Sequence, residues 1–145
     1  MIRRLASGRS WLQVLACLAL FAAVAAHAQD PRAIGAQSAA RAWLALVDRG
    51  DADASHAAAG KKFQEQLDAA GWRDALVRAR EPLGAMVNRT ALATRFDTKL
   101  PGGPDGDYAQ VLFETQYASG STVRETVTLE REPDGVWRVM GYLIR

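Results

Sequence analysis

The segment TVRETVTLE, residues 122–130, decides the fold, because its apolar and polar side chains alternate. Val123, Val127 and Leu129 share one face, whereas the even-numbered positions hold only Thr, Arg or Glu. A period of two residues is that of a β-strand with one buried face and one face in solvent. The segment therefore predicts a β-strand in a sheet that covers a hydrophobic core with one face and exposes its other face to solvent.

The sequence on either side of this segment predicts further strands joined by tight turns. Over residues 109–117, apolar side chains again alternate with polar ones. The turn signals between the predicted strands are Pro104-Asp105-Gly106, Ser119-Gly120-Ser121 and Pro133-Asp134-Gly135. Such turns favour antiparallel hairpins. Another strand is expected over residues 85–94, which makes a sheet of four strands.

The last predicted strand, residues 137–144, differs from the others because both of its faces are apolar. One face carries Trp137, Val139 and Leu143, and the other carries Met140, Tyr142 and Ile144. A strand that is apolar on both faces is typical of the middle of a sheet. We therefore expect a central position for it.

The front of the chain has the periodicity of helices. A stripe of apolar residues, spaced for one side of a helix that ends at Gly50, consists of Ala36, Ala39, Ala40, Trp43, Leu44 and Val47. Shorter helical pieces are expected from Asp51 or Asp53 to Gly60, around Phe63 and Leu67, and from Gly71 to about Glu81. Helices followed by a run of strands predict an α+β fold. We expect one domain over residues 29–145, in which N-terminal helices pack on a curved, mostly antiparallel four-stranded sheet.

Residues 1–28 have the pattern of an export signal. Three arginines form a basic head, residues 11–26 are apolar apart from one glutamine, and Ala26-His27-Ala28 supplies the small-x-small pattern of a cleavage site. The apolar run is shorter than the ~20 residues that a membrane-spanning helix needs. We therefore expect a signal-peptide helix that is cleaved between Ala28 and Gln29. The mature protein would then be periplasmic, with no stable membrane anchor.

Two other interpretations of this segment compete with the general secretory route. Val14-Leu15-Ala16-Cys17 loosely resembles a lipoprotein box, although residues 18–26 stay apolar where a polar tether is usual. Arg3-Arg4 would fit a twin-arginine signal, but the strongly apolar run that follows suits the general route better.

Charge and cysteine content narrow the classes of partner. Removing the three signal arginines from the 18 Lys and Arg leaves 15 against 16 Asp and Glu, a net charge of −1. This balance provides no basic surface for nucleic acid. Cys17 is the only cysteine and leaves with the signal, and His56 is the only histidine of the mature chain. We therefore expect no metal site and no cofactor.

Glu125 is the main candidate for chemistry. It lies in phase with Val123, Val127 and Leu129, so its carboxylate should point toward the core. One interpretation is a structural ion pair with an arginine of the helical layer, Arg80 first and Arg89 second. The alternative is a general acid or base at the floor of a pocket, since perturbed carboxylates cluster at active sites.

Asp48 and His56 are weaker candidates for a catalytic role. Asp48 lies one turn after Leu44, near the end of the first predicted helix, where a solvated or capping acid is ordinary. His56 lies in an alanine-rich helix end, where a partly buried surface histidine is the common case. The tryptophans on the predicted core faces are explained by packing.

Several motifs of the mature chain resemble the DUF4019 family. They are Ala42-Trp43-Leu44, Val47-Asp48-Arg49-Gly50, Trp72, Arg80-Glu81-Pro82-Leu83-Gly84, Leu100-Pro101-Gly102, Pro104-Asp105-Gly106-Asp107-Tyr108, Glu125-Thr126-Val127-Thr128-Leu129 and Asp134-Gly135-Val136-Trp137-Arg138-Val139-Met140-Gly141-Tyr142. The family comprises small, mostly exported bacterial proteins of unknown function. It tends to carry Trp at position 56, so the resemblance implies a packing role for His56. Its order of elements resembles cystatin-like or NTF2-like α+β rolls, which host carriers, enzymes and dimerisation modules.

These observations predict a non-catalytic module that binds an unknown small ligand or protein on the concave face of its sheet. The alternative is a small acid–base enzyme of the NTF2-like type, with Glu125 or Asp48 as the base. A third hypothesis is a homodimer formed through the face that carries Met140, Tyr142 and Ile144.

Overall fold

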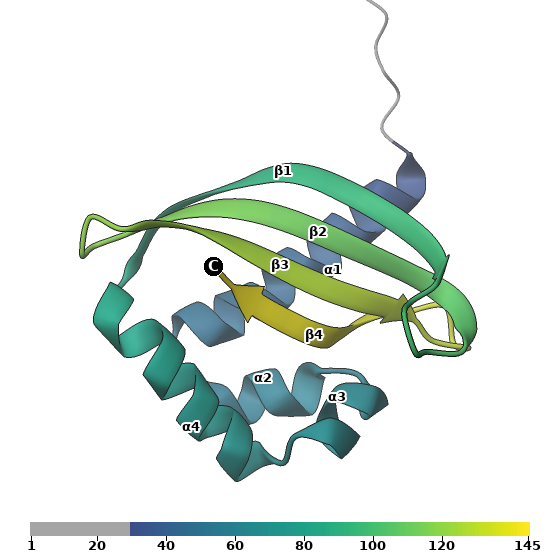
Figure 1. Cartoon of the computed structure of the whole chain (residues 1–145), viewed down its shortest axis with the longest axis horizontal. Coiled ribbons are helices and arrows are strands. Elements are labelled where there is room, and N and C mark those ends of the chain that lie inside the picture. Colours follow the sequence, from purple (N-terminus) through teal and green to yellow (C-terminus); the bar gives the residue numbers. More distant parts are fainter. Residues whose placement is uncertain (1–29) are drawn as a thin grey trace, which may run out of the picture.

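The computed structural model describes residues 30–145 and shows helices first and strands second (Figure 1). The elements are α1 (Pro31–Asp48), α2 (Ala52–Ala58), α3 (Lys61–Gln66), α4 (Ala69–Arg80), the 3₁₀ turn η1 (Glu81–Leu83), β1 (Met86–Lys99), β2 (Asp105–Tyr117), β3 (Thr122–Arg131) and β4 (Trp137–Ile144). The predicted α+β class is confirmed. The predicted signal-peptide helix lies outside the described residues.

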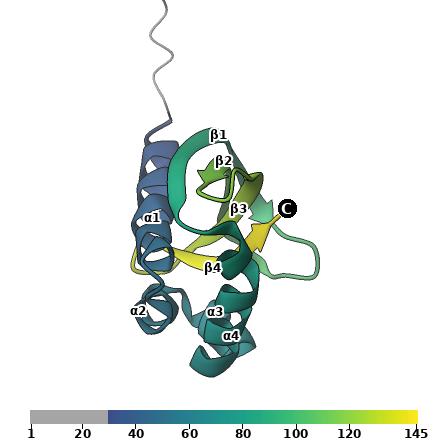
Figure 2. The same cartoon turned by 90° about the vertical axis from the view of Figure 1, so that its left-hand side faces the viewer.

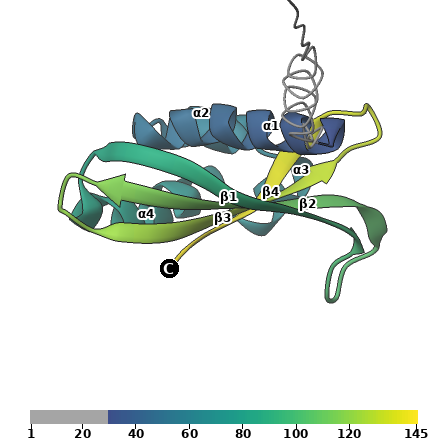
Figure 3. The same ribbon diagram turned by 90° about the horizontal axis from the view of Figure 1, so that it is seen from above.

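Among residues 30–145, the strands form one antiparallel sheet of four, in the order β1-β2-β3-β4. Figure 3 shows how strongly the strands twist across one another. In the register, Val127 of β3 pairs with Val111 of β2 and with Tyr142 of β4. Directly opposed residues share a face, so these three side chains lie on the core side of the sheet. β1 continues to Lys99, five residues past the predicted end, because Phe96 pairs with Ala109 on this same side.

The expected central position of residues 137–144 is wrong, because β4 is an edge strand. Leu129 pairs with Val139 but Thr128 pairs with Gly141, which leaves Met140 as an extra residue in a β-bulge. The bulge changes the phase of the strand. Tyr142 therefore shares the core face with Val139, while Leu143 is 44% exposed on the other face.

This bulge also corrects the predicted faces of β4. Val139 and Leu143 do not share a face, and Met140 is the extra residue of the bulge, without a partner on β3. The face that was proposed for a homodimer is therefore not one continuous surface. Both faces of the strand carry apolar residues because these residues have different apolar neighbours. Val139 meets the core, whereas Met140 lies with Leu100 and Pro101 at the turn between β1 and β2.

α1 lies along the core face of the sheet (Figure 2). The predicted apolar stripe is its buried side, with Ala36, Ala40, Trp43, Leu44 and Val47 buried. The shorter helices α2, α3 and α4 lie beyond the β4 edge (Figure 1). Asp51 and Asp68 cap α2 and α4, since their carboxylates accept hydrogen bonds from the amides of Ala54 and Gly71. α4 therefore begins before Gly71 rather than after it.

An aromatic cluster fills the space between the sheet and the helices. The ring centroids of Trp43 and Trp72 are 5.6 Å apart, and that of Tyr142 is 5.4 Å from Trp43. Both indole N–H groups donate to Ser55, one to its carbonyl oxygen at 2.8 Å and the other to its hydroxyl at 2.9 Å. In the described part of the chain, every buried side-chain nitrogen and oxygen has a hydrogen-bond partner. Trp43 and Trp72 belong to the hydrophobic core, and Tyr142 packs against it.

None of the helices within residues 30–145 has the length and apolar character needed to cross a membrane.

Candidate functional site

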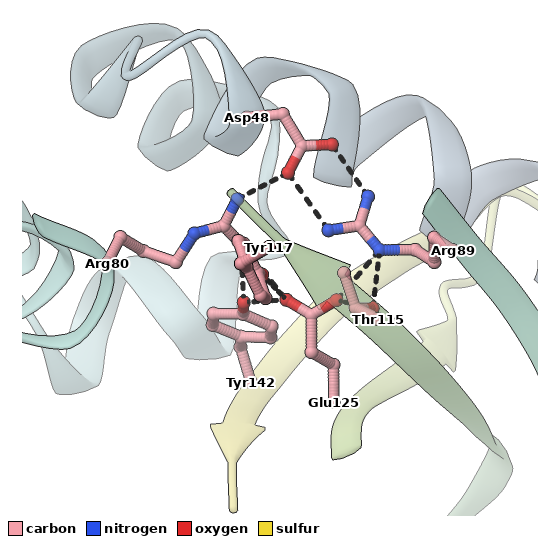
Figure 4. A network of polar contacts seen from close by, with 7 residues as sticks. All are labelled: Asp48, Arg80, Arg89, Thr115, Tyr117, Glu125 and Tyr142. Carbon is pink, nitrogen blue, oxygen red and sulfur yellow. Dashed lines mark hydrogen bonds and ion pairs between the residues drawn. The ribbon is translucent and has the colours of Figure 1, made fainter. Parts of the chain in front are cut away.

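Seven polar side chains meet where the ends of α1 and α4 approach the sheet (Figure 4). They come from six elements and are Asp48, Arg80, Arg89, Thr115, Tyr117, Glu125 and Tyr142. We call this group the ion-pair network. The network contains two carboxylates and two guanidinium groups, so its formal charges cancel.

Local sequence places each charged member at its position. Asp48 is the last residue of α1, and Arg80 is the last residue of α4, just before Pro82 brings the chain out of the helix. Arg89 pairs with Thr115 across β1 and β2, on the face that looks toward the core. Glu125 occupies the core face of β3, two residues before Val127.

Glu125 is fully buried and accepts five hydrogen bonds. Its Oε1 accepts from the Tyr117 hydroxyl at 2.8 Å, from Arg80 Nη1 at 3.0 Å and from the Tyr142 hydroxyl. Its Oε2 accepts from Arg89 Nε at 2.7 Å and from the Thr115 hydroxyl. Both carboxylate oxygens are thus surrounded by donors that come from the protein itself.

Asp48 bridges the same two arginines from the opposite side. Its Oδ2 accepts from Arg89 Nη1 at 2.6 Å, and its Oδ1 accepts from Arg89 Nη2 at 2.9 Å. This bidentate geometry is the strong form of an arginine–carboxylate pair. Asp48 Oδ1 also accepts from Arg80 Nη2, so each arginine contacts both carboxylates.

The pKa values in the network follow from burial opposed by pairing. Burial acts to raise the pKa of Glu125, but hydrogen bonds from Arg89, Thr115 and Tyr142 outweigh it and leave the pKa below its ordinary value. The pKa of Asp48 is lowered in the same way by hydrogen bonds from Arg89 and Arg80, against the opposing effect of burial. Both acids are therefore held as carboxylates.

The two tyrosines shift in the opposite direction. Burial and the neighbouring Glu125 carboxylate raise the pKa of Tyr117 and of Tyr142, because a phenolate there would be desolvated and repelled. Their hydroxyls stay protonated and donate to Glu125. The Arg80 guanidinium also lies over the Tyr117 ring, with 4.8 Å between its Cζ atom and the ring centroid.

Two open grooves adjoin the network, and Asp48 lines both of them. The α4 groove has a volume of about 530 Å³ and is lined on either side by the turn after α1 and by α4 with η1. The β1 groove has a volume of about 300 Å³ and lies between α1 and the start of β1, beside Arg41 and Val87. On the core face of the sheet, α1 and the aromatic cluster pack against the strands.

The structure places the three candidate residues in two separate environments. Asp48 and Glu125 belong to the same network, joined through both arginines. His56 lies apart, with its Nε2 atom 2.7 Å from the carbonyl oxygen of Leu67 and its ring 6.1 Å from that of Phe63. These contacts are those of a packed side chain.

Sequence reasoning missed that Asp48 and Arg80 belong with three hydroxyl groups of the sheet. One signal was present in β2, where Thr115 stands between Phe113 and Tyr117 in the core phase. A polar residue in that phase needs a buried partner, and Glu125 supplies it. No such signal existed for Tyr142, because its phase depends on the bulge.

Within residues 30–145, no three His, Cys, Asp or Glu side chains are grouped so that they could hold a metal ion. Comparison with curated proteins and with solved structures found no match. Comparison with protein families found one, a family described as a protein of unknown function, DUF4019, whose profile matches residues 39–142. That range holds all seven residues of the ion-pair network and every residue that lines the two grooves. The chain belongs to the DUF4019 family.

Proposed function

We propose that the protein is a non-catalytic periplasmic module that binds a small ligand in the α4 groove. The observation that carries the proposal is the groove itself, an opening of about 530 Å³ that Asp48 and Arg80 of the ion-pair network border. Ligand sites are concave, of about 300–1,000 Å³, and mostly apolar with a few polar groups. The α4 groove has a volume in this range, and its open lining combines apolar and polar groups in similar measure.

The lining of the groove combines apolar and charged groups. Val47, Ala52 and Leu76 are buried residues that form apolar wall, and Val77 is 51% exposed beside them. Asp48 and Arg80 supply polar groups whose positions are determined by the network. A site whose side chains are already ordered loses less entropy on binding.

The geometry of Glu125 supports a binding role over the acid–base alternative. A general base must lie within hydrogen-bonding reach of the proton that it removes. Glu125 is 0% exposed, and both of its oxygens are already engaged by donors of the protein. Asp48 borders the groove, but its oxygens accept from two arginines that hold it as a carboxylate with a lowered pKa.

Export to the periplasm is supported by the pattern of residues 1–28. N-terminal sequencing of the protein from a periplasmic extract should give Gln29 as the first residue. Replacing Ala28 with a bulky residue should block processing, because the cleavage site takes small residues. A protein that begins at a lipid-modified Cys17 would contradict this and place it on a membrane.

Native mass spectrometry of the protein purified from the periplasm tests the binding site. We expect a fraction of the protein to retain a small molecule. In Val77→Trp the new ring should occupy the α4 groove, so the added mass should disappear. Val136→Trp is the matched control, because Val136 is 47% exposed and lines neither groove.

Two results would contradict the proposal. One is retention of the same ligand by Val77→Trp, which would place the site elsewhere. The other is a protein that carries no added mass and binds nothing from a periplasmic extract. Circular dichroism of both variants should match the parent, because both substitutions are made at exposed positions.

A further inference from the structure

We infer that the ligand of the α4 groove is a small zwitterion with an aliphatic body, such as a short peptide or an amino acid with free amino and carboxyl groups. This inference rests on the proposed function and specifies its ligand. It follows from counting which charges of the groove are already compensated by the protein.

Most charges that line the groove have partners. Asp48 and Arg80 belong to the ion-pair network, where two carboxylates meet two guanidinium groups. Arg73 forms an ion pair with Asp53, with 2.6 Å between Nη2 and Oδ1. These groups keep their charges without a ligand.

Two charged side chains of the groove lining have no ion-pair partner among the described residues. Arg49 and Glu81 both line the groove and are exposed, and neither side chain makes an ion pair or hydrogen bond with the described residues. Arg49 follows the end of α1, and Glu81 follows the end of α4. The groove therefore carries one uncompensated positive charge and one uncompensated negative charge, from the two segments that border it.

A ligand that complements this surface has a carboxylate for Arg49 and an ammonium group for Glu81. Arginine presents a planar fork of N–H donors that matches a carboxylate. In the same groove, Leu76 and the half-exposed Val77 offer apolar contact. A purely anionic ligand would leave Glu81 unpaired, and a purely cationic ligand would leave Arg49 unpaired.

The volume of the groove bears on whether the ligand is a peptide or a free amino acid. An extended chain spans about 3.3–3.6 Å per residue, so the termini of a peptide lie further apart than the two charged groups of a free amino acid. A volume of about 530 Å³ accommodates more than a single amino acid and therefore favours a peptide. The experiment separates the two sources.

The test measures binding of four probes to the full periplasmic protein by isothermal titration calorimetry. The probes are leucyl-leucine, its N-acetyl derivative, its C-terminal amide, and free leucine. We expect leucyl-leucine to bind about tenfold or more tightly than either blocked derivative, because each lacks one charge-assisted contact. Tighter binding of free leucine than of leucyl-leucine would assign the amino acid as the source.

Two variants connect each ligand charge to its residue. Arg49→Gln should weaken leucyl-leucine about tenfold and leave the amide unchanged, since the amide has no carboxylate. Glu81→Gln should weaken leucyl-leucine and leave the N-acetyl derivative unchanged. Arg78→Gln and Asp74→Asn are the matched controls, because both residues are exposed on α4 and neither lines the groove.

The outcomes separate this inference from the proposed function. If both blocked derivatives bind as well as leucyl-leucine, and Val77→Trp abolishes all binding, the groove is a ligand site but the zwitterion is overturned. If none of the probes binds while the purified protein retains another molecule that Val77→Trp loses, the zwitterion is again overturned and the proposed function stands. If nothing binds and nothing is retained, both are overturned.

Discussion

At the scale of single residues, Glu125 shows how a fully buried carboxylate is accommodated. Removing a charge from water costs several kcal/mol, and the cost is offset only where the geometry of pairing is good and the remaining lone pairs are satisfied. Five donors meet Glu125, and two of them are arginines. The same arrangement makes the loss of one partner costly, because another charge is then left buried.

Glu125→Gln should destabilise the protein by about 3–5 kcal/mol, because Arg80 and Arg89 then share one counter-charge instead of two. The double variant Glu125→Gln with Arg80→Met should recover part of the loss. It leaves Asp48 and Arg89, which form a bidentate pair of opposite charges. The double variant with Arg89→Met should recover less, because Arg80 contacts Asp48 through Nη2 alone.

Urea unfolding of the parent, the single variants and both double variants measures these differences. A double-mutant cycle isolates the coupling between the two sites. Additive free energies of unfolding for Glu125 and Arg80 would show that the pair is not coupled and would contradict the prediction.

At the scale of elements, the register of β3 decides which of its side chains support the core. Val127 is fully buried opposite Val111 and Tyr142, whereas Thr126 lies on the other face opposite Leu112 and Leu143. The pleat reverses the direction of neighbouring side chains, so adjacent positions differ sharply in burial.

Val127→Ala should cost about 1–3 kcal/mol, since it removes buried methyl groups and leaves a small cavity. Thr126→Ala should stay within about 1 kcal/mol of the parent, because its side chain is on the outer face. Chemical denaturation of the two variants measures both values. The reverse order of stability would mean that the register of β3 is shifted by one residue.

The bulge at Met140 can be tested in β4 by the same kind of comparison between a buried and an exposed residue. Val139→Ala should cost about 1–3 kcal/mol, because Val139 is 1% exposed and packs in the core. Leu143→Ala should cost less than about 1 kcal/mol, because Leu143 is 44% exposed across the bulge. An unbulged strand would place both residues on the same face and would give two similar losses in thermal or urea unfolding.

At the scale of the whole molecule, the ion-pair network joins the C-terminal ends of α1 and α4 to all four strands of the sheet. Its charges balance, so its contribution to stability depends on the protonation state of the members. The acids have lowered pKa values and the tyrosines have raised ones. The protein should therefore be most stable between the two titration ranges.

Acid should destabilise the protein in a defined range. The pKa values of Asp48 and Glu125 lie below their ordinary values of 3.8 and 4.5, so the unfolded chain binds protons first as the pH falls. The stabilisation is complete above those ordinary values and is lost as the pH falls through the lower folded values. Urea unfolding at a series of pH values from 6 to about 2 measures the loss.

Alkaline pH should also destabilise the protein, this time through the two tyrosines. The pKa values of Tyr117 and Tyr142 are raised above their ordinary 10.0, so stability is complete below pH 10 and is lost as the pH rises further.

Glu125→Gln is the control for the prediction at acid pH, because it removes one of the two carboxylates and should reduce the slope of the free energy of unfolding against pH. A free energy of unfolding that stays constant down to about pH 2 would contradict the assignment of these carboxylates as paired.

Local periodicity was enough to determine the class of fold. The alternation in residues 122–130, the helical stripe in α1 and the turn signals depend only on neighbours in the chain, so they predicted helices packed on a four-stranded antiparallel sheet. The core phase of Glu125 was equally visible, and with it the need for an arginine partner.

The tertiary structure alone decided what the sequence left open. β4 lies at the edge of the sheet, and the bulge at Met140 turns Tyr142 toward Glu125, because the partner strand determines where one residue is skipped. Asp48 meets Arg80 and Arg89 across separations of 32 and 41 residues, which no local pattern encodes. The α4 groove likewise exists only where helix ends from distant parts of the chain approach each other. Contacts of this kind depend on how whole elements pack, and periodicity within one element carries no information about them.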